Sequence, residues 1–230
     1  MVWKMIYLAR RNPMLAAEQF PQAWREHSAL GRQCRNVGQR VKSVAQCSRV
    51  LDAALPGASA TYDGVNLMVL ADRESASAIW GDPETLAVMK PDEPRVFDRY
   101  VREFTLVCRE QLLRDAPRTP VLLCAFLRRR ADLSAAEFRL SWIAAGPGSQ
   151  LLRGPLGQAH RVVHNEVVDM PPPGYEYDLI VEWWFESVQE LQRAVGDAPD
   201  LPALLAPPLA GLLDMPNSVF MLTRVTHARP

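Results

Sequence analysis

Histidine offers this sequence its clearest route to chemistry near neutral pH, and only four histidines are present. His27 is the main candidate, because at 100° per residue it falls within about 60° of Phe20 and Trp24 on a helix. An imidazole on such an aromatic stripe titrates near neutrality and could act as a general acid or base. The alternative is a core or helix-end histidine that hydrogen-bonds a backbone carbonyl. His27 is therefore the candidate catalytic residue.

Four further side chains could bind a substrate: Trp24, Arg40, Asn66 and Trp80. Asn66 lies inside an apolar segment, so it needs hydrogen-bond partners if it is buried, and a substrate could supply them. Arg40 precedes an expected strand, and its guanidinium would suit an anionic group, although a surface position explains it equally well. Trp24 and Trp80 could line a cavity or simply fill the core.

Other polar residues have structural interpretations. His164 lies in an expected strand on the face of Val162 and Val168, which favours a packed or cross-strand-bonded histidine. Asp63 and Asp178 begin matching strands, and an aspartate at both places indicates a cap or a turn.

Composition and motifs exclude several classes of function. The chain has 26 basic and 26 acidic residues, so we expect no nucleic-acid or membrane-surface partner. It has no G-x-G-x-x-G, Walker, G-x-S-x-G or H-E-x-x-H motif, and no His/Cys/carboxylate cluster has metal-ligand spacing. We therefore expect a small-molecule ligand and neither a metal nor a cofactor.

The cysteines and the hydropathy pattern bear on location. None of the four cysteines belongs to a C-x-x-C pair, and no window approaches ~18 uninterrupted apolar residues. We therefore expect a reduced, cytoplasmic protein without a transmembrane helix.

An internal repeat must position these residues. The segment from Leu15 to Trp24 recurs from Leu133 to Trp142, an offset of 118 residues. Two further pairs recur at an offset of 115, namely Tyr62-Asp63 with Tyr177-Asp178 and Gly81-Asp82 with Gly196-Asp197. The repeat predicts two domains, residues 1–113 and 120–230, joined by a linker that contains prolines.

Each half shows the order strand, helix, strand, strand, helix, strand, which is that of the ferredoxin-like unit. Such a unit leaves one face of its sheet uncovered, and the other copy can bury that face. We therefore predict an α+β fold of two ferredoxin-like βαββαβ units packed sheet to sheet as a fused barrel. The chain could then be a monomer, and further association stays open. The expected strands are 4–9, 40–51, 62–71, 103–109, 121–127, 160–168, 178–185 and 218–226, and the main expected helices are 18–30, 75–80, 135–144 and 188–195.

The order of these motifs resembles the EthD-like family of dimeric α+β barrel proteins. In the first half the resemblance rests on Leu15, Phe20, Trp24 and His27, on Tyr62-Asp63-Gly64-Val65, and on the acidic segment 92–98. In the second half it rests on Leu133, Glu137, Phe138 and Trp142, on Arg161-Val162-Val163-His164-Asn165, and on Tyr177-Asp178. The resemblance implies a tandem duplication of this fold and a role among small-molecule enzymes or accessory proteins of degradative and polyketide pathways.

The second copy departs from the family pattern. No histidine follows Trp142, and a proline- and leucine-rich stretch at 201–214 replaces the acidic segment. Trp24 and His27 are also separated by two residues, where the family usually has three. We therefore expect the working site in the first half, with the larger polar-lined cavity beside His27 and a smaller or filled space near Trp142.

Three functional hypotheses follow. The leading one is a cofactor-free enzyme that transfers protons, by isomerisation, cyclisation, dehydration or decarboxylation, on an apolar aromatic or polyketide-like substrate. The second is a non-catalytic ligand carrier or accessory protein of a degradative pathway. The third is a haem-binding barrel with His27 as its single candidate ligand, because related barrels can hold haem.

Overall fold

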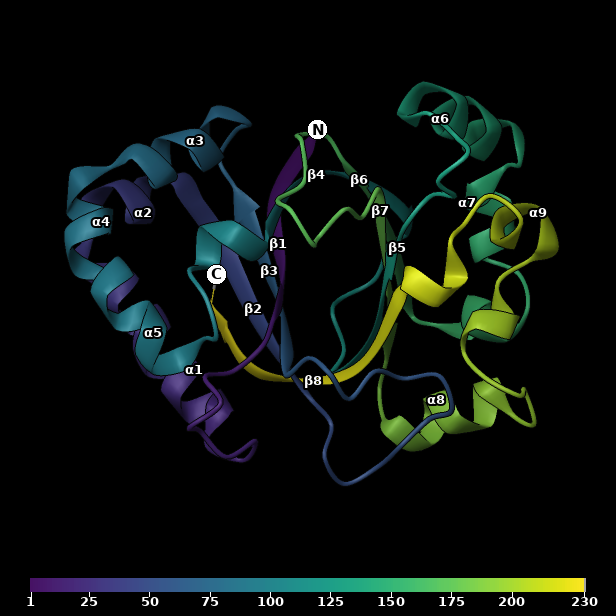
Figure 1. Ribbon diagram of the computed structural model, residues 1–230. Helices are drawn as coiled ribbons and strands as arrows, with labels where there is room; N and C mark the ends of the chain where they lie inside the picture. Colours follow the sequence, from purple (N-terminus) through teal and green to yellow (C-terminus); the bar gives the residue numbers. More distant parts are fainter. Residues whose placement is uncertain (230) are drawn as a thin grey trace.

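Eight strands form one closed antiparallel barrel in the computed structural model, which describes residues 1–229 (Figure 1). Neighbouring strands follow the order β1-β3-β2-β8-β5-β7-β6-β4 around the barrel. Their bounds are β1 Val2–Ala9, β2 Val41–Arg49, β3 Gly64–Leu70, β4 Thr105–Arg114, β5 Val121–Leu127, β6 Arg161–Val167, β7 Leu179–Phe185 and β8 Val219–Arg229.

The two halves of the chain contribute four strands each, in the same order. These are β4-β1-β3-β2 in the first half and β8-β5-β7-β6 in the second. Because β2 pairs with β8 and β4 pairs with β6, the halves join edge to edge at two seams. The predicted α+β fold of two βαββαβ units is therefore confirmed, and one chain closes the barrel as an internal pseudo-dimer.

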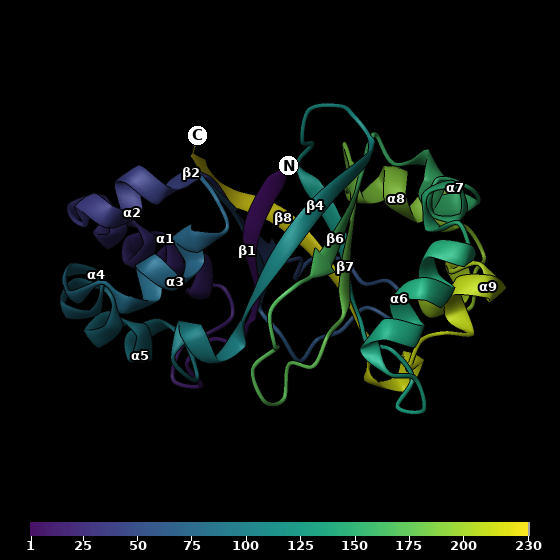
Figure 2. The same cartoon turned by 90° about the horizontal axis from the view of Figure 1, so that it is seen from above.

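The helices lie outside the barrel, with one layer beside each half (Figure 1, Figure 2). The α-helices of the first half are α1 Phe20–Leu30, α2 Arg35–Arg40, α3 Glu74–Gly81, α4 Pro83–Val88 and α5 Glu93–Val96. Those of the second half are α6 Ala135–Ala144, α7 Pro147–Leu151, α8 Val188–Val195 and α9 Pro207–Ala210. Short 3-10 helices connect them, at η1 Gly31–Gln33, η2 Lys90–Asp92, η3 Val101–Phe104, η4 Pro155–Gln158, η5 Pro202–Leu204 and η6 Met215–Asn217.

The first helices of the two halves begin differently. Helix α6 starts with a capping box, in which the Ser134 side chain accepts from the Glu137 amide and the Glu137 carboxylate accepts from the Ser134 amide. Helix α1 has no side-chain cap, and Pro21 occupies its first turn, where a missing N–H costs nothing. The buried face of α1 carries Trp24 and His27, so this start positions the candidate catalytic residue against the sheet.

Side chains of each strand alternate between the barrel interior and a helical layer. In β1, Lys4 and Ile6 face the interior, whereas Met5 and Tyr7 face the helices of the first half. Burial on both faces explains why strands such as β5 and β7 are buried at every position.

An arginine–aspartate pair recurs at the same place in both halves. The backbone amide and guanidinium of Arg11 donate to Asp63, and those of Arg129 donate to Asp178. Each pair ties the end of the first strand to the residue at the start of the third. The structural role predicted for Asp63 and Asp178 is therefore confirmed.

Within residues 1–229, no helix combines the length and the apolar character that crossing a membrane requires.

Candidate functional site

A cavity of about 70 Å³ lies between the sheet and the helices of the first half. Its walls are largely apolar, with a few polar side chains among them. Four polar or aromatic residues of the wall matter most for chemistry, namely Tyr7, His27, Asn66 and Glu93. This combination of an apolar surface with few polar groups is typical of small-molecule sites.

His27 is held in one orientation by a carboxylate. Its side chain is only 4 % exposed, and its Nδ1 lies 3.0 Å from Oδ2 of Asp92, the last residue of η2. Because a carboxylate only accepts hydrogen bonds, Nδ1 carries the proton and Nε2 keeps its lone pair. Burial lowers the pKa of His27, and this outweighs the opposing effect of the Asp92 hydrogen bond. The imidazole is therefore neutral at pH 7 and equipped to act as a base.

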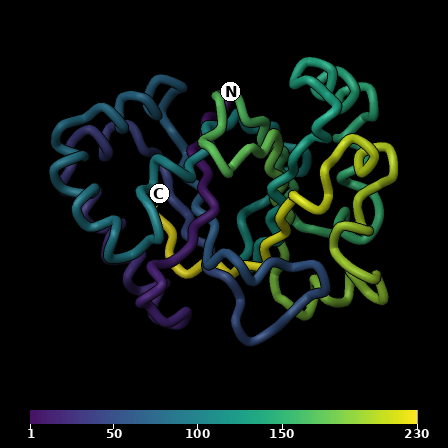
Figure 3. Tube along the Cα trace, in the orientation of Figure 1, coloured from purple at the N-terminus to yellow at the C-terminus, as the bar shows by residue number. Residues whose placement is uncertain are grey.

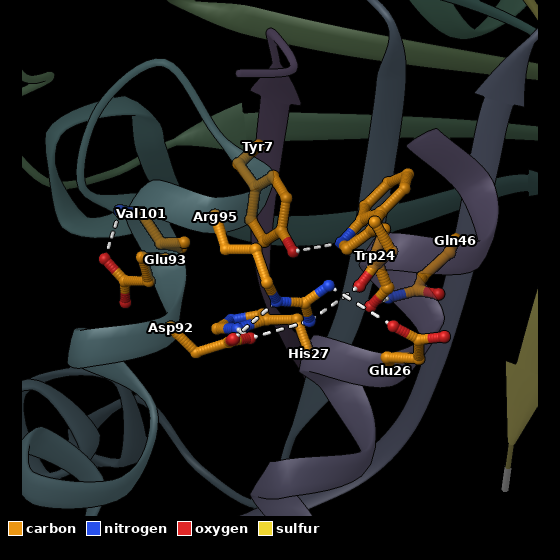
Figure 4. Close-up of polar contacts among 10 residues, drawn as sticks. Tyr7, Trp24, Glu26, His27, Gln46, Asp92, Glu93, Arg95 and Val101 are labelled. Carbon is orange, nitrogen blue, oxygen red and sulfur yellow. Dashed lines mark hydrogen bonds and ion pairs between the residues drawn. The ribbon is translucent and has the colours of Figure 1, made fainter. Parts of the chain in front are cut away.

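Asp92 is itself fixed by a cation. The guanidinium of Arg95 donates to both carboxylate oxygens of Asp92, at 2.7 and 3.1 Å, and also contacts Glu26 (Figure 4). Burial acts to raise the pKa of Asp92, but the hydrogen bonds from Arg95 and His27 bring it below its usual value. Asp92 is thus ionised at neutral pH and would stabilise a proton gained by His27.

Two hydrogen-bond donors face the cavity from neighbouring strands. Tyr7 and Asn66 are directly paired across β1 and β3, so their side chains lie next to each other on one face. Asn66 is 1 % exposed, and neither its Oδ1 nor its Nδ2 has a hydrogen-bond partner. The Tyr7 hydroxyl accepts from Trp24 Nε1 at 2.9 Å, and burial raises its pKa, so its O–H stays protonated (Figure 4). These two groups could together bind a ligand oxygen that gains negative charge.

Glu93 adds a second titratable group to the cavity wall. It is 7 % exposed, its Oε2 accepts from the Val101 amide at 2.9 Å, and burial raises its pKa. The environment therefore moves the pKa values of Glu93 and His27 in opposite directions, a pattern found where one group donates and another accepts a proton.

The structure brings some of the predicted binding residues together and leaves others apart. Asn66 and Trp80 line the His27 cavity, whereas Trp24 is fully buried behind Tyr7 and packs against Phe20. Arg40 ends α2, where its Nε donates to Asn36, and it is not part of the cavity wall. Nothing in its surroundings supports a binding role for Arg40 at this cavity.

The sequence around His27 and Asp92 matches a protein-family model. The model described as the EthD domain matches residues 12–100. Residues 12–100 form an EthD domain. The match includes α1 with His27 and the acidic segment with Asp92, and it confirms the resemblance predicted from the sequence.

Solved structures with the same fold cover nearly the whole chain. An anthrone oxidase-like protein superposes with a TM-score of 0.62 at 12 % identity, covering 99 % of this chain and 92 % of its own. A putative monooxygenase from Lactobacillus acidophilus superposes with a TM-score of 0.51 at 8 % sequence identity, covering 99 % of this chain and 94 % of its own. A chlorite dismutase from Candidatus Nitrospira defluvii superposes with a TM-score of 0.52 at 10 % sequence identity, covering 98 % of this chain and 91 % of its own. At these identities the likeness shows the dimeric α+β barrel fold alone. No curated protein matched the chain.

The second half holds a cavity of its own, contrary to our expectation. A hollow of about 180 Å³ lies beside Trp142 and His164, so it exceeds the volume beside His27 in the EthD domain. The expectation of a smaller or filled space there is wrong. Trp24 packs directly over Gly64, since a Cβ atom at this position would lie 2.5 Å from the Trp24 ring. Leu179 occupies the equivalent place in the second half, where it and Trp142 both line the hollow.

The particular polar groups of the His27 cavity are missing from the second half, whose cavity is lined by other polar residues such as Arg109, Glu166 and Asp178. Ala125 and Val181 form the strand pair that corresponds to Tyr7 and Asn66. His164 is buried and accepts from Trp142 Nε1 at 3.1 Å, as its structural interpretation predicted. The second cavity is larger, but it lacks the His–Asp pair and the two adjacent donors.

Two further hollows lie beside the His27 cavity and share lining residues with it. One, of about 140 Å³, shares Trp80 and Glu93 with it, and an open one, of about 720 Å³, shares Trp80 and Thr105. Trp80 therefore borders all three spaces.

Haem fits the His27 cavity poorly. The His27 cavity has about 70 Å³, whereas pockets for drug-sized ligands measure roughly 300–1,000 Å³, and a porphyrin needs at least such a volume. In residues 1–229, no group of three or more His, Cys, Asp or Glu side chains is arranged to hold a metal ion. His27 Nε2, the expected haem ligand, therefore lies beside a cavity without room for the ring.

Proposed function

We propose that the first-half site catalyses proton transfer on a small, mainly apolar molecule that carries a carbonyl group. The observation that supports this most directly is the His27–Asp92 pair in a cavity that also holds the unpartnered amide of Asn66. A buried polar group without a partner costs about 1–3 kcal/mol, so its presence is explained best by a ligand that completes it.

The chemistry assigned to each residue follows from its protonation state. His27 Nε2 takes a proton from the carbon next to the carbonyl group, and the electrons of that C–H bond move onto the carbonyl oxygen. Asp92 stabilises the imidazolium, while Asn66 and Tyr7 donate hydrogen bonds to the enolate oxygen. Return of the proton to the same or another carbon regenerates neutral His27 and completes an exchange or an isomerisation.

The cavity wall favours an aromatic or polyketide-like substrate. Met5, Met68 and Met89 line it, and such flexible thioethers adapt to ligand shape. A ring system would displace these side chains or Trp80 toward the adjoining hollows, since the cavity is small. One structural neighbour is described as anthrone oxidase-like, and an anthrone is an apolar ketone with an acidic methylene group.

Deuterium exchange tests the proposal without knowledge of the natural substrate. The protein is incubated in D₂O with carbonyl C–H acids such as anthrone and 2-tetralone, and NMR follows loss of the acidic proton. We expect exchange above the buffer rate, a fall of about 10²–10⁴ in His27→Gln, and a smaller fall in Asp92→Asn. Because the pKa of His27 is lowered, the exchange rate should stay constant as the pH falls below 6.5 and should decline only at a lower pH.

His160→Gln is the matched control, because His160 is half-exposed in the second half and pairs with Glu190. It should leave the exchange rate unchanged. Exchange by His27→Gln at the wild-type rate would exclude His27 as the base.

The alternative is a non-catalytic carrier, which the mainly apolar wall of the same cavity also suits. Compounds that bind to the wild-type protein without faster exchange would favour the carrier over the enzyme.

A further inference from the structure

Arg229 reaches the first-half cavity from the other end of the chain. It ends β8, the last strand of the second half, which pairs with β2 across one seam of the barrel. Figure 3 shows this strand as the yellow end of the chain, crossing to the purple and blue elements of the first half. Arg229 lines the cavity that contains His27, so the second half contributes a residue to the site.

Among residues 1–229, no acidic side chain pairs with the guanidinium of Arg229. Its Nε is buried without a hydrogen-bond partner, and its side chain forms no ion pair or hydrogen bond with any other residue in 1–229. Burial and the nearby Arg32 lower the pKa of Arg229. A partly buried cation without a partner is unfavourable unless a ligand supplies the missing charge.

The internal repeat provides a comparison for this arginine. Arg114 ends β4 and pairs with Val162, as Arg229 pairs with the equivalent Val44. The guanidinium of Arg114 donates to the carbonyl oxygens of Gly157 and Ala159 at 2.5 and 2.7 Å. Arg114 therefore serves the structure of the second half, whereas its counterpart Arg229 makes no such bond within residues 1–229.

Further positive charge surrounds Arg229. Arg25 and Arg32 come from α1 and η1, and His227 precedes Arg229 by two residues on β8, so it points to the same side. Burial and the three arginines lower the pKa of His227, so the imidazole is neutral at pH 7 and the positive charge here is that of Arg25, Arg32 and Arg229. None of these arginines forms an ion pair with an acidic residue in the described part of the chain. Gln111 takes the register position of His227 in the second half, so the patch belongs to the first half alone.

We propose that the ligand of the first-half site carries a carboxylate, which Arg229 binds while the apolar part of the ligand fills the His27 cavity. This rests on the proposed function for the apolar part and extends it to the chemical class of the substrate. The planar guanidinium matches a carboxylate, and the surrounding cations raise the local concentration of anions.

A pair of near-isosteric probes tests the proposal. Calorimetry measures the affinities of benzoate and of neutral benzamide for the wild-type protein, Arg229→Gln and the control Arg114→Gln. We expect benzoate to bind about tenfold or more tightly than benzamide, as a charge-assisted hydrogen bond implies. Arg229→Gln should abolish this preference and leave benzamide binding intact, and Arg114→Gln should retain it.

The outcomes separate this inference from the proposed function. Equal affinities for both probes, or a preference that survives in Arg229→Gln, would overturn the carboxylate site and leave the apolar cavity standing. If neither probe binds, sodium acetate is titrated into protein with ¹⁵N-labelled arginine side chains, and NMR follows the Nε–H signal of Arg229. A saturable shift of the Arg229 Nε–H signal then supports the carboxylate site and counts against the apolar cavity, and an unchanged signal overturns the inference.

Discussion

At the scale of single residues, the two halves of this chain differ at one buried strand position. Asn66 is buried without partners, whereas Val181 fills the equivalent position in the second half with an apolar side chain. Natural proteins tolerate such unfavourable groups where a ligand needs them. The strand pair Tyr7 and Asn66 is thus a more specific indication of a binding site than the volume of the cavity.

Asn66→Val should stabilise the protein and impair its activity. Removing the unpaired amide should raise the free energy of unfolding by about 1 kcal/mol, which corresponds to roughly 2–4 °C in Tm. The exchange rate on carbonyl C–H acids should fall at least about tenfold, since one donor to the enolate is lost. Thermal unfolding and NMR exchange measure the two effects, and a lower Tm would contradict the assignment of Asn66 as unsatisfied.

His164 should make the fold sensitive to acid. Burial lowers the pKa of His164 to about 4, so the unfolded chain binds its proton first as the pH falls. Stability from this group is complete above about pH 6.5 and is lost on acidification toward pH 4, by roughly 3 kcal/mol. His164→Gln keeps an acceptor for Trp142 and removes the titration. Urea unfolding of both proteins at pH 7 and pH 4 should show a smaller loss in the variant, and equal losses would disprove the assignment.

At the scale of elements, one glycine determines how closely the helix that carries His27 packs against the sheet. Gly64 begins β3 and lies under the Trp24 ring, so α1 can approach the sheet closely. The EthD-domain strand Tyr62-Asp63-Gly64-Val65 therefore has a packing reason for its glycine. Because Trp24 and His27 share one helix, a shift of the tryptophan also moves the imidazole relative to Asp92.

Gly64→Ala should damage the site through α1. The added methyl group overlaps the Trp24 ring, which should lower the free energy of unfolding by about 1–3 kcal/mol and reduce the exchange rate. Gly38→Ala is the control, because Gly38 lies in helix α2 with open space around it and should be neutral or slightly stabilising. Denaturant unfolding measures both, and similar effects of the two substitutions would refute the packing argument.

At the scale of the whole molecule, a buried ionic cluster joins the halves inside the barrel. Lys4 Nζ lies 2.5 Å from a carboxylate oxygen of Glu110 and 2.6 Å from one of Glu182, and neither Lys4 nor Glu182 is exposed. Asn165 and Trp184 also donate to Glu182. Since Lys4 comes from the first half and Glu182 from the second, the cluster favours one arrangement of the two sheets.

Lys4→Ala should destabilise the barrel strongly, because it leaves two carboxylates buried without their cation. We expect a loss of about 3–5 kcal/mol in the free energy of unfolding. Arg73→Ala is the matched control, since Arg73 and Asp169 also bridge the halves but lie half-exposed, where an ion pair contributes less than about 1 kcal/mol. Denaturant unfolding compares them, and a loss below about 1 kcal/mol for Lys4→Ala would show that the cluster is dispensable.

Short-range patterns predicted the eight strands and the four main helices of this protein, but not the short helices α2, α4, α5, α7 and α9. Apolar alternation and the capping box of Ser134 and Glu137 depend on neighbours within a few residues, and both had their expected places in the structure. The repeat also predicted the architecture, because two equal units that each leave a sheet face open have one economical way to cover it.

The site depended on contacts between distant parts of the chain. His27 meets Asp92 across 65 residues, and Arg229 reaches the same cavity only because β8 crosses a seam of the barrel. The sequence marked His27 and the acidic segment as peculiar to the first half, but their contact, the Tyr7–Asn66 pair and the wall formed by Glu93 follow from strand register and helix placement. Register and close packing are set by the summed burial of the whole barrel, so no local pattern encodes which of these side chains meet.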